Sequence, residues 1–146
     1  MRAPLQKFIK LRKIHLIMRE TVNVAIIRNA KILLVRKGQS WLLPGGKPNP
    51  GESDIGCLCR EVDEELSGTR LENIKYYNEF VGDTHIQERF RTKVYLADIG
   101  GELREPSAEI KEYGWVDNTS KYNLSDMNLK VMDSLIRDGY LRRPSD

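Results

Sequence analysis

The apolar residues of this chain recur with two different spacings, and these spacings predict where strands and helices lie. Residues 21–28 and 31–37 are apolar at most positions, which is typical of strands that are buried on both faces. A short turn at Asn29-Ala30 would join them. Residues 71–81 predict a weaker strand, and residues 113–116 a short one.

Residues 88–98 show a strict alternation of the kind expected for a strand with two different faces. One face would carry Phe90, Thr92, Val94 and Leu96. The other would carry a basic stripe made of Arg89, Arg91 and Lys93, together with Tyr95. Gly100-Gly101 is expected to turn the chain after this strand.

Two segments have the spacing of amphipathic helices. The first would begin at an N-cap provided by Ser53 or Asp54 and stop near Gly68. Its expected buried stripe is Ile55, Leu58, Cys59, Val62 and Leu66. The second would follow residues 123–126 and run to about Arg137, just before Gly139. Its expected buried stripe is Leu129, Met132, Leu135 and Ile136.

This order of strands, a helix, more strands and a final helix predicts an α/β layered fold with a mixed sheet between helices. The 146 residues are 40% hydrophobic and 31% charged, which fits one domain, 1–146, with a real core. No internal repeat or low-complexity tract divides the chain.

Three acids on the first helix, Glu61, Glu64 and Glu65, stand three and four residues apart, so that they are neighbours on one side of it. They are expected to lie on a sector different from the apolar stripe. Like charges at this spacing repel one another, so a divalent cation would stabilise them. Mg²⁺ and Mn²⁺ are the natural candidates because they prefer carboxylate and water oxygens.

A loop of alternating glycine and proline, LPGGKPNPGE, leads into this helix. Gly45 and Gly46 would let the backbone approach a ligand closely, while the prolines stiffen the loop. Taken alone, such a loop is more often a plain turn between a strand and a helix. Its meaning comes from the acids that follow it.

The spacing Gly46-x5-Glu52-x7-Arg60-Glu61-Val62-x-Glu64-Glu65 resembles the Nudix box, G-x5-E-x7-R-E-U-x-E-E-x-G-U, where U is a bulky apolar residue. Seven of the nine specified positions match. Ser67 and Gly68 depart from the end of the box, where it has glycine and an apolar residue. This departure is interpreted as a glycine displaced by one position in the helix stop.

The resemblance implies a MutT-like hydrolase with an α/β/α sandwich fold and Mg²⁺, or Mn²⁺, as its cofactor. It implies that water attacks the pyrophosphate link of a nucleoside diphosphate joined to another moiety. Glu61, Glu64 and Glu65 would bind the metal with the main chain of Gly45, Glu52 would support them, and Arg60 would orient the acids. The catalytic set is therefore expected to include Glu61, Glu64, Glu52 and Arg60.

Other parts of the implied site are less specific to the family. Glu109, and equally Glu112, resembles the position where many members keep an additional acid that acts as general base or metal ligand. Gly45, Gly46, Arg89 and Arg91 are candidates for binding the substrate, although a solvated sheet face or a dimer contact explains the two arginines equally well.

The absence of other subfamily motifs favours a nucleoside triphosphate pyrophosphohydrolase, acting on normal or oxidised nucleotides. Hydrolysis of ADP-ribose, a nucleotide sugar or a dinucleoside polyphosphate is the alternative within the family. An alternative function of another class is a Nudix-like module that binds a nucleotide or RNA without turnover. The intact acids argue against this alternative, because a binding module need not keep all of them. Isopentenyl diphosphate isomerisation uses a related fold, but the chain is short for it.

The net charge of +3 is unevenly distributed. The first nineteen residues carry six basic residues and no acid, which leaves 18 basic against 21 acidic residues in the rest of the chain. This basic N-terminal extension, 1–20, also contains interleaved apolar residues. Packing on the domain is therefore favoured over binding of RNA, of a membrane surface or of a polyphosphate.

No run of 18 apolar residues is present, so the sequence predicts neither a membrane span nor a secretory signal. The two cysteines, Cys57 and Cys59, stand two apart on the predicted helix and point to different sectors, so they cannot easily bridge one another and are expected to be reduced. We therefore expect a cytoplasmic enzyme that binds a small nucleotide as its substrate. It is expected to be a monomer or a homodimer.

Overall fold

A mixed β-sheet lies between two helices in the computed structural model, which describes residues 19–83, 89–106, 109–117 and 121–143. The elements, in chain order, are β1 (Arg19–Arg28), β2 (Lys31–Lys37), β3 (Ser40–Leu42), β4 (Gly45–Gly46), α2 (Asp54–Glu65), β5 (Thr69–Asp83), β6 (Arg89–Gly101), β7 (Glu112–Val116) and α3 (Asp126–Arg137). Most of the N-terminal extension, residues 1–18, lies outside the described residues. Its last two residues, Arg19 and Glu20, already belong to β1.

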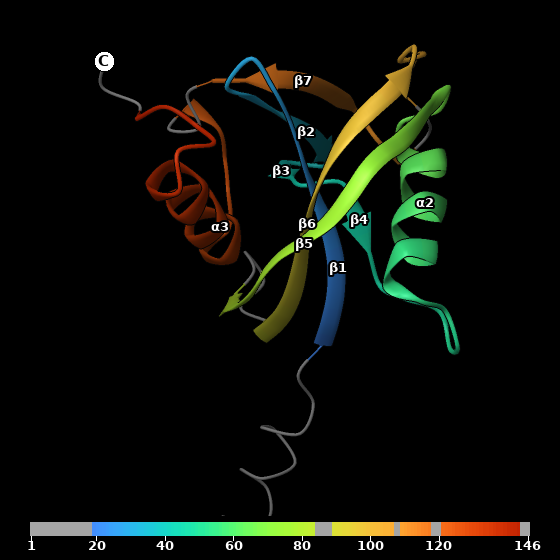
Figure 1. Ribbon diagram of the computed structural model, residues 1–146, viewed down its shortest axis with the longest axis horizontal. Helices are drawn as coiled ribbons and strands as arrows, with labels where there is room; N and C mark the ends of the chain where they lie inside the picture. The colour runs from blue at the N-terminus through green and yellow to red at the C-terminus, as the bar shows by residue number, and fades with distance from the viewer. Residues whose placement is uncertain (1–18, 84–88, 107–108, 118–120, 144–146) are drawn as a thin grey trace, which may run out of the picture.

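The long strand β1 organises the sheet, whose strand order is β3-β2-β1-β6-β5 (Figure 1). Its first eight residues pair in parallel with β6, and its last two, Ile27 and Arg28, pair antiparallel with β2. The two-residue strand β4 also pairs with β1, and β7 pairs with β2. The sheet is therefore mixed, as the order of elements predicted.

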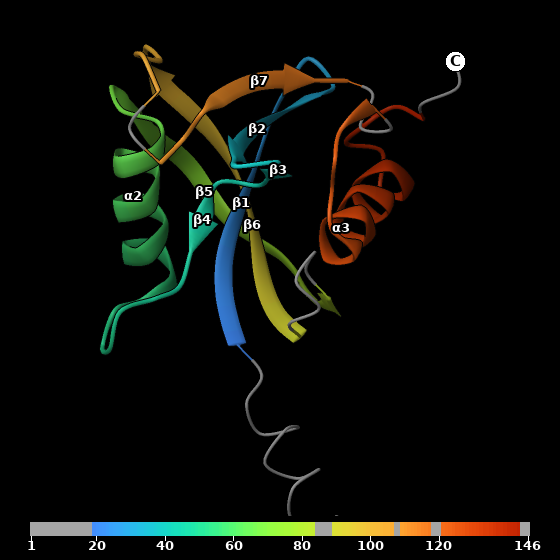
Figure 2. The same cartoon turned by 180° about the vertical axis from the view of Figure 1, so that it is seen from behind.

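Helices α2 and α3 cover opposite sides of the sheet, as Figure 1 and the view from behind in Figure 2 show. Each helix packs into its own hydrophobic cluster: Leu58 and Val62 of α2 meet Val24 and Ile26 of β1, while Val131 and Leu135 of α3 meet Ala25 from the same strand. Successive residues of β1 thus face different clusters, because side chains alternate along a strand. This arrangement confirms the α/β/α sandwich.

The predicted strands are confirmed with small changes in their bounds. The turn between β1 and β2 is tight because Asn29 and Ala30 both have positive φ, 54° and 61°, as a two-residue hairpin of this hand requires. The prediction that Gly100-Gly101 turns the chain was wrong, since both glycines still pair with β5 at the end of β6. Strands β3 and β4 were not predicted, because two or three residues carry no measurable periodicity.

The first helix begins at the cap expected for it, and the second begins within the segment expected to lead into it. Ser53 Oγ accepts a hydrogen bond from the Gly56 amide at 3.0 Å, and Ser125 Oγ accepts one from the Asn128 amide at 3.3 Å. The predicted stripes were partly wrong. Ile55 and Leu129 are about half exposed, at 49% and 46%. Cys59 is also exposed.

The buried faces are rotated by about one residue from the predicted ones. In α2 the buried residues are Cys57, Leu58, Val62 and Glu65, and in α3 they are Met127, Asn128, Val131, Met132, Ser134 and Leu135. Polar residues thus occupy positions on both buried faces. A prediction that considers only apolar residues leaves these positions out, so it places the buried face incorrectly.

Both cysteines are free, and Cys57 is buried, where loss of solvation raises the pKa of its thiol to about 11.

Strand β5 forms one edge of the sheet and is the longest strand, with 15 residues. Its pairing with β6 is interrupted by register shifts between Glu72 and Lys75 and between Tyr76 and Asn78. These irregularities change which face of the sheet each side chain meets.

Of the described helices, none has the length and apolar character needed to cross a membrane.

Candidate active site

The candidate site forms where β4 brings the glycine-proline loop against helix α2. Gly45 and Gly46 pair with Asn23 and Val22 of β1, so the loop is tied into the sheet before the helix begins. The Asn23 amide donates a hydrogen bond to the Leu43 carbonyl at 3.1 Å and accepts one from Thr92 Oγ1 at 2.7 Å. This side chain fixes the backbone just ahead of the two glycines.

Gly45 is the residue that allows the loop to approach both the sheet and the helix. Its φ is 139°, and a Cβ at this position would lie 2.2 Å from the Val22 carbonyl oxygen. No residue with a side chain fits there. Its amide donates a hydrogen bond of 2.9 Å to Glu65 Oε1, which joins β4 to the end of α2.

Glu65 is buried rather than displayed beside the other acids, contrary to the expectation that all three share an exposed sector. Its side chain is only 3% exposed, because position 65 follows Leu58 by seven residues and so shares its face of the helix. Lys37 Nζ of β2 lies 2.8 Å from its second oxygen, Oε2. Burial raises the pKa of Glu65, while Lys37 and the Gly45 amide oppose that increase.

Gly46 leaves the space that the Glu61 carboxylate occupies. A Cβ on Gly46 would stand 2.5 Å from Glu61 Oε1 and 2.7 Å from its Cδ. The Glu61 side chain is 15% exposed. Gly46, the first glycine of the box, therefore positions an acid by leaving room for it, and its φ is not in the left-handed region.

Arg60 links the acids at the start and in the middle of the box. Its guanidinium makes a two-point contact with Glu52, with Nε to Oε2 and Nη2 to Oε1 both at 2.9 Å, and a further hydrogen bond of 2.9 Å to Glu61. Glu64 lies farther away, at 3.7 Å, and its side chain is 59% exposed. Arg60 thus holds Glu52 and Glu61 in place and leaves Glu64 toward solvent.

The pairing with Arg60 sets the protonation of Glu52. The hydrogen bonds from Arg60, with one from the Asn49 amide, lower the pKa of Glu52 from 4.5 to about 2. The hydrogen bonds of Arg60 with Glu52 and Glu61 raise the pKa of Arg60 above its ordinary value. Glu52 is consequently a fixed anion at neutral pH, suited to holding Arg60 and not to transferring protons.

The first turn of α2 is held to the sheet by a second set of contacts. Tyr95 of β6 donates a hydrogen bond of 2.7 Å to Asp54 Oδ2, and Lys93 Nζ lies 3.5 Å from the same oxygen. This hydrogen bond and burial together raise the pKa of Tyr95 to about 12, with burial the larger cause. The Tyr95 hydroxyl is therefore a stable donor that fixes where the helix starts.

The basic stripe on β6 is paired with acids rather than open. Arg91 contacts Glu20 at 3.5 Å and Glu79 at 3.8 Å, and Arg89 lies 4.0 Å from Asp83. Arg91 and Lys93 also line a cavity of about 30 Å³ next to Pro48 and Asp54, so they stand near the box loop. Their predicted role in binding substrate stays a prediction.

Glu109 and Glu112 precede and begin strand β7. Glu112 lies 3.8 Å from Arg36. Glu109 is exposed and comes directly before Ile110, which is buried in the cluster under α2. Within the described ranges, no hydrogen bond or ion pair connects Glu109 to the box acids, and its role as an additional acid stays a prediction.

Whether these residues suit a divalent cation depends on their donor atoms. Among the described residues, no three His, Cys, Asp or Glu side chains stand in a ready-made metal arrangement. Glu65 Oε2 is nevertheless a buried carboxylate oxygen whose charge is balanced by a cation, the Lys37 ammonium 2.8 Å away. The charge of Glu61 also raises the pKa of Glu65, so the two acids are electrostatic neighbours. This set of hard oxygen donors suits Mg²⁺ once Lys37 moves aside.

Two residues of the site were missed by the sequence reasoning, namely Asn23 and Lys37. Asn23 is a polar residue within an apolar strand, which is the signal that could have revealed it. Lys37 is the last residue of β2 and is separated from the apolar run of that strand by Arg36. Its contact with Glu65 depends on a pairing of distant segments that no local pattern records.

The end of the box is built against the end of β6. Gly68 has φ 89°, and a Cβ there would lie 2.4 Å from the Glu102 carbonyl oxygen. Gly101 faces it, since a Cβ on Gly101 would lie 2.3 Å from the Gly68 carbonyl oxygen. The departure at Ser67-Gly68 is therefore a glycine required one position later, as interpreted from the sequence.

Comparisons with known proteins agree with this geometry. The sequence model of the NUDIX domain family matches residues 18–131. A MutT NUDIX hydrolase from Burkholderia pseudomallei is 31% identical, with 67% of this chain and 81% of that chain covered and a TM-score of 0.60. The E. coli ORF135 protein is 26% identical, with 88% and 96% covered and a TM-score of 0.65.

A more distant structure, the MutT protein from Methanosarcina mazei, shares the fold at 21% identity, with 84% and 96% covered and a TM-score of 0.63. The comparison with curated proteins found no match.

Proposed function

The chain belongs to the Nudix family, whose hydrolases act on nucleoside diphosphate derivatives, and from this premise we propose that it is a Mg²⁺-dependent nucleoside triphosphate pyrophosphohydrolase. The products would be a nucleoside monophosphate and pyrophosphate. Family membership rests on the match over residues 18–131. The choice of triphosphate is supported by the absence of the sequence motifs typical of other subfamilies.

One observation supports the chemistry most directly, namely the convergence of Glu61 and Glu65 on the Gly45-Gly46 backbone. Gly45 binds Glu65 through its amide at 2.9 Å, and Gly46 is shaped around Glu61. Glu65 is thus held by a main-chain group of a different element, and Glu61 fits against the backbone of that same element. Such preorganisation is what phosphoryl transfer needs, since positioning and electrostatic stabilisation provide most of its catalysis.

In this proposal Glu61, Glu64 and Glu65 hold the cation, together with the main chain of Gly45. The chemistry that a Mg²⁺ ion would supply there is neutralisation of charge on phosphoryl oxygens and a lowered pKa of the attacking water. Arg60 keeps Glu61 in position and is itself held by the permanently ionised Glu52. Lys37 compensates the buried charge of Glu65 when no cation does.

Three further residues are proposed to contact the substrate or to assist the reaction outside the box. Arg91 stands beside Pro48 of the box loop, and its position supports a role in binding phosphate. Arg89 would extend the same stripe, and Glu109 would act as an additional acid. The two free cysteines are compatible with a reducing compartment, so we also propose that the enzyme works in the cytoplasm.

The test is a panel assay of the full chain with Mg²⁺. Nucleoside triphosphates, their oxidised forms, ADP-ribose, nucleotide sugars, dinucleoside polyphosphates and capped RNA would each be offered, and the released phosphate species identified. Pyrophosphate and a monophosphate from a triphosphate are expected. Cleavage of only another member of the panel would replace the triphosphate assignment, and no cleavage of any of them would favour a binding module.

A variant of Glu64 separates catalysis from folding. Glu64→Gln is expected to lower turnover at least about a hundredfold, the scale of losing a positioned catalytic group. The matched control is Asp63→Asn, which changes the exposed neighbouring acid on α2. Equal rates for the two variants, with both folded, would contradict the assignment of Glu64.

A further inference from the structure

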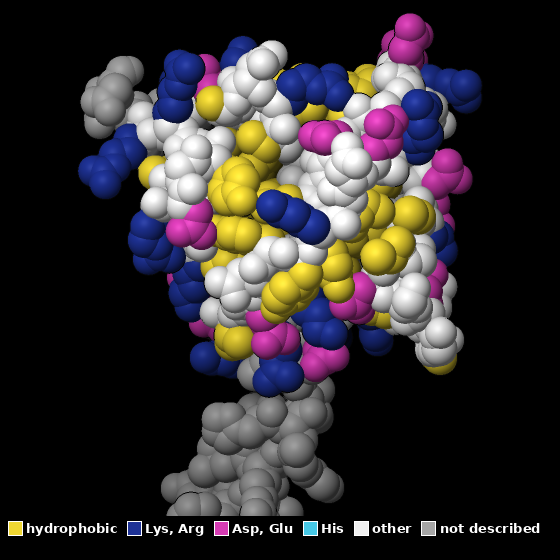
Figure 3. All heavy atoms as spheres, viewed as in Figure 1, with side chains coloured by type: hydrophobic (Ala, Val, Ile, Leu, Met, Phe, Trp, Pro, Cys, Tyr) yellow, Lys and Arg dark blue, Asp and Glu magenta, His cyan; other side chains and the backbone are white. Residues whose placement is uncertain are grey.

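A hollow of about 280 Å³ opens on the side of the sheet that α3 covers, away from the box acids. Its floor is formed by Ala25 of β1 and Leu96 of β6, which belong to the core cluster under α3. Figure 3 shows hydrophobic side chains exposed in the middle of this face, over the sheet between α3 and β5. The volume suits a ligand with a body about as large as one aromatic ring.

The bulge in β5 forms one wall of the hollow. Between the pairs Glu72–Asp98 and Lys75–Leu96, two residues of β5 stand opposite the single residue Ala97. Asn73 takes a left-handed conformation there, with φ 53°, and its amide donates a hydrogen bond of 3.0 Å to Asp98. Bulges of this kind redirect side chains and are frequent beside binding sites.

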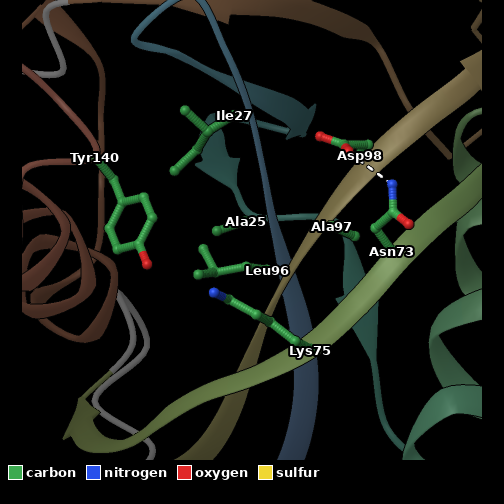
Figure 4. Close-up of a pocket in the computed structure, with 8 residues that line it drawn as sticks. All are labelled: Ala25, Ile27, Asn73, Lys75, Leu96, Ala97, Asp98 and Tyr140. Carbon is green, nitrogen blue, oxygen red and sulfur yellow. Dashed lines mark hydrogen bonds between the residues drawn. The ribbon is translucent and has the colours of Figure 1, made fainter.

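Two donors point into the hollow from opposite sides, as Figure 4 shows for Lys75 of β5 and Tyr140 beyond the end of α3. Lys75 makes no ion pair or hydrogen bond with any residue that the structure describes. The Tyr140 hydroxyl likewise has no described partner, while its ring packs edge-on against Tyr77 at 5.8 Å. An ammonium and a hydroxyl therefore both point over an apolar floor, and neither has an acceptor among the residues that the structure describes.

The charge of the hollow selects among anions. Lys75 is the one cation among the described residues that line it, and Asp98 stands at its rim, bound to Asn73. A single positive charge beside a carboxylate matches an anion of one charge better than a phosphate monoester of two. The apolar floor of Ala25, Ile27 and Leu96 matches a hydrophobic body attached to that anion.

We propose that this hollow is a binding site for a small organic carboxylate with a ring-sized apolar body. Lys75 and Tyr140 would bind the carboxylate, and the body would rest on the floor residues. Helices α2 and α3 lie on opposite sides of the sheet, so the site is separate from the box acids and does not depend on the activity proposed for them. A ligand bound there would join β5 to the segment that follows α3.

The experiment is a titration of the isotope-labelled full chain with benzoate, followed by amide chemical shifts. The expected shifts are saturable and concentrated at residues 73–75, 96–98 and 140, with a dissociation constant on the order of 1 mM for a ligand of this size. Benzamide, which has the same shape but no charge, is expected to bind at least about fivefold more weakly.

Variants of the protein test the two donors. Lys75→Met keeps most of the apolar stem and removes the charge, and it should weaken benzoate binding at least about fivefold, while Tyr140→Phe should weaken it about twofold to fivefold. Lys31→Met, on the exposed start of β2, is the matched control and should bind as the unchanged protein does. Absence of shifts at the hollow, equal binding of benzamide, or unchanged binding in Lys75→Met would each overturn the proposal.

Discussion

Replacing Gly46 with alanine should move the Glu61 carboxylate and so reveal whether its position controls catalysis. The backbone at Gly46 is open to any residue, but the new Cβ would stand 2.5 Å from Glu61 Oε1. Carbon and oxygen atoms in contact need about 3.5 Å, so the carboxylate must retreat by about 1 Å. The substitution therefore displaces the Glu61 carboxylate without changing its charge or its chemical nature.

The expected loss is large for catalysis and small for stability. A misplacement of 1 Å costs on the order of a hundredfold in rate, which corresponds to about 2.7 kcal/mol of transition-state stabilisation. The contact of Glu61 with Arg60, now 2.9 Å, would lengthen, and such a partly exposed pair contributes about 1 kcal/mol or less to folding. We expect kcat/KM to fall about a hundredfold while Tm changes by a few degrees.

The assay is steady-state release of pyrophosphate from the best nucleotide of the panel, with Tm measured on the same protein. Gly114→Ala on β7 is the matched control, because a Cβ there meets nothing within 4 Å and its backbone is not left-handed. It should leave both quantities unchanged. A folded Gly46→Ala protein that keeps kcat/KM within about threefold of the unchanged enzyme would refute the reasoning that Glu61 must sit against Gly46.

Three further predictions concern the same surroundings. Lys37→Met removes the cation beside buried Glu65 and should lower the free energy of unfolding without metal by about 1–3 kcal/mol, measured in urea, while Mg²⁺ should raise Tm more than it does in the unchanged protein. An equal metal response would contradict the placement of Glu65 in the metal site. Because the pKa of Glu52 is lowered from 4.5 to about 2, its contribution to stability is complete above pH 4.5 and is lost as the pH falls toward 2. Urea midpoints of Glu52→Gln should lack that part of the acid loss, and an unchanged acid profile would argue against the pairing with Arg60. Leu58→Ala should cost about 2–5 kcal/mol, since this side chain is fully buried under α2, and a cost below about 1 kcal/mol would contradict that packing.

The features predicted correctly from the sequence are those that depend on residues close together in the chain. Helix starts at Ser53 and Ser125, the hairpin at Asn29-Ala30 and the box spacing are local, and they were recovered from neighbouring residues. The burial of Glu65 was not recovered. A charged residue is assigned to solvent unless its partner is known, and the partner here comes from β2.

The same limit explains the misplaced stripes of the two helices. Ile55 and Leu129 are apolar residues that remain exposed, while polar Asn128 and Ser134 are buried. Hydrophobic periodicity locates a helix correctly, but its rotation is decided by which groups find hydrogen bonds in the interior. In α3, the Ser134 hydroxyl donates one to the Tyr77 oxygen at 2.7 Å, because the Tyr77 hydroxyl itself donates to Asp138.

The contact between Gly68 and Gly101 makes the end of the box and the end of β6 a single coupled unit. Restoring the usual family residues at positions 67 and 68 by consensus design would place a side chain 2.4 Å from the Glu102 carbonyl oxygen, and would be expected to destabilise the protein. Relatives that carry an apolar residue at position 68 should therefore differ in length or course at positions 100–104. The residue at position 68 and the segment 100–104 are therefore predicted to change together among relatives. Chimaeras that exchange only one of these two segments should fold poorly.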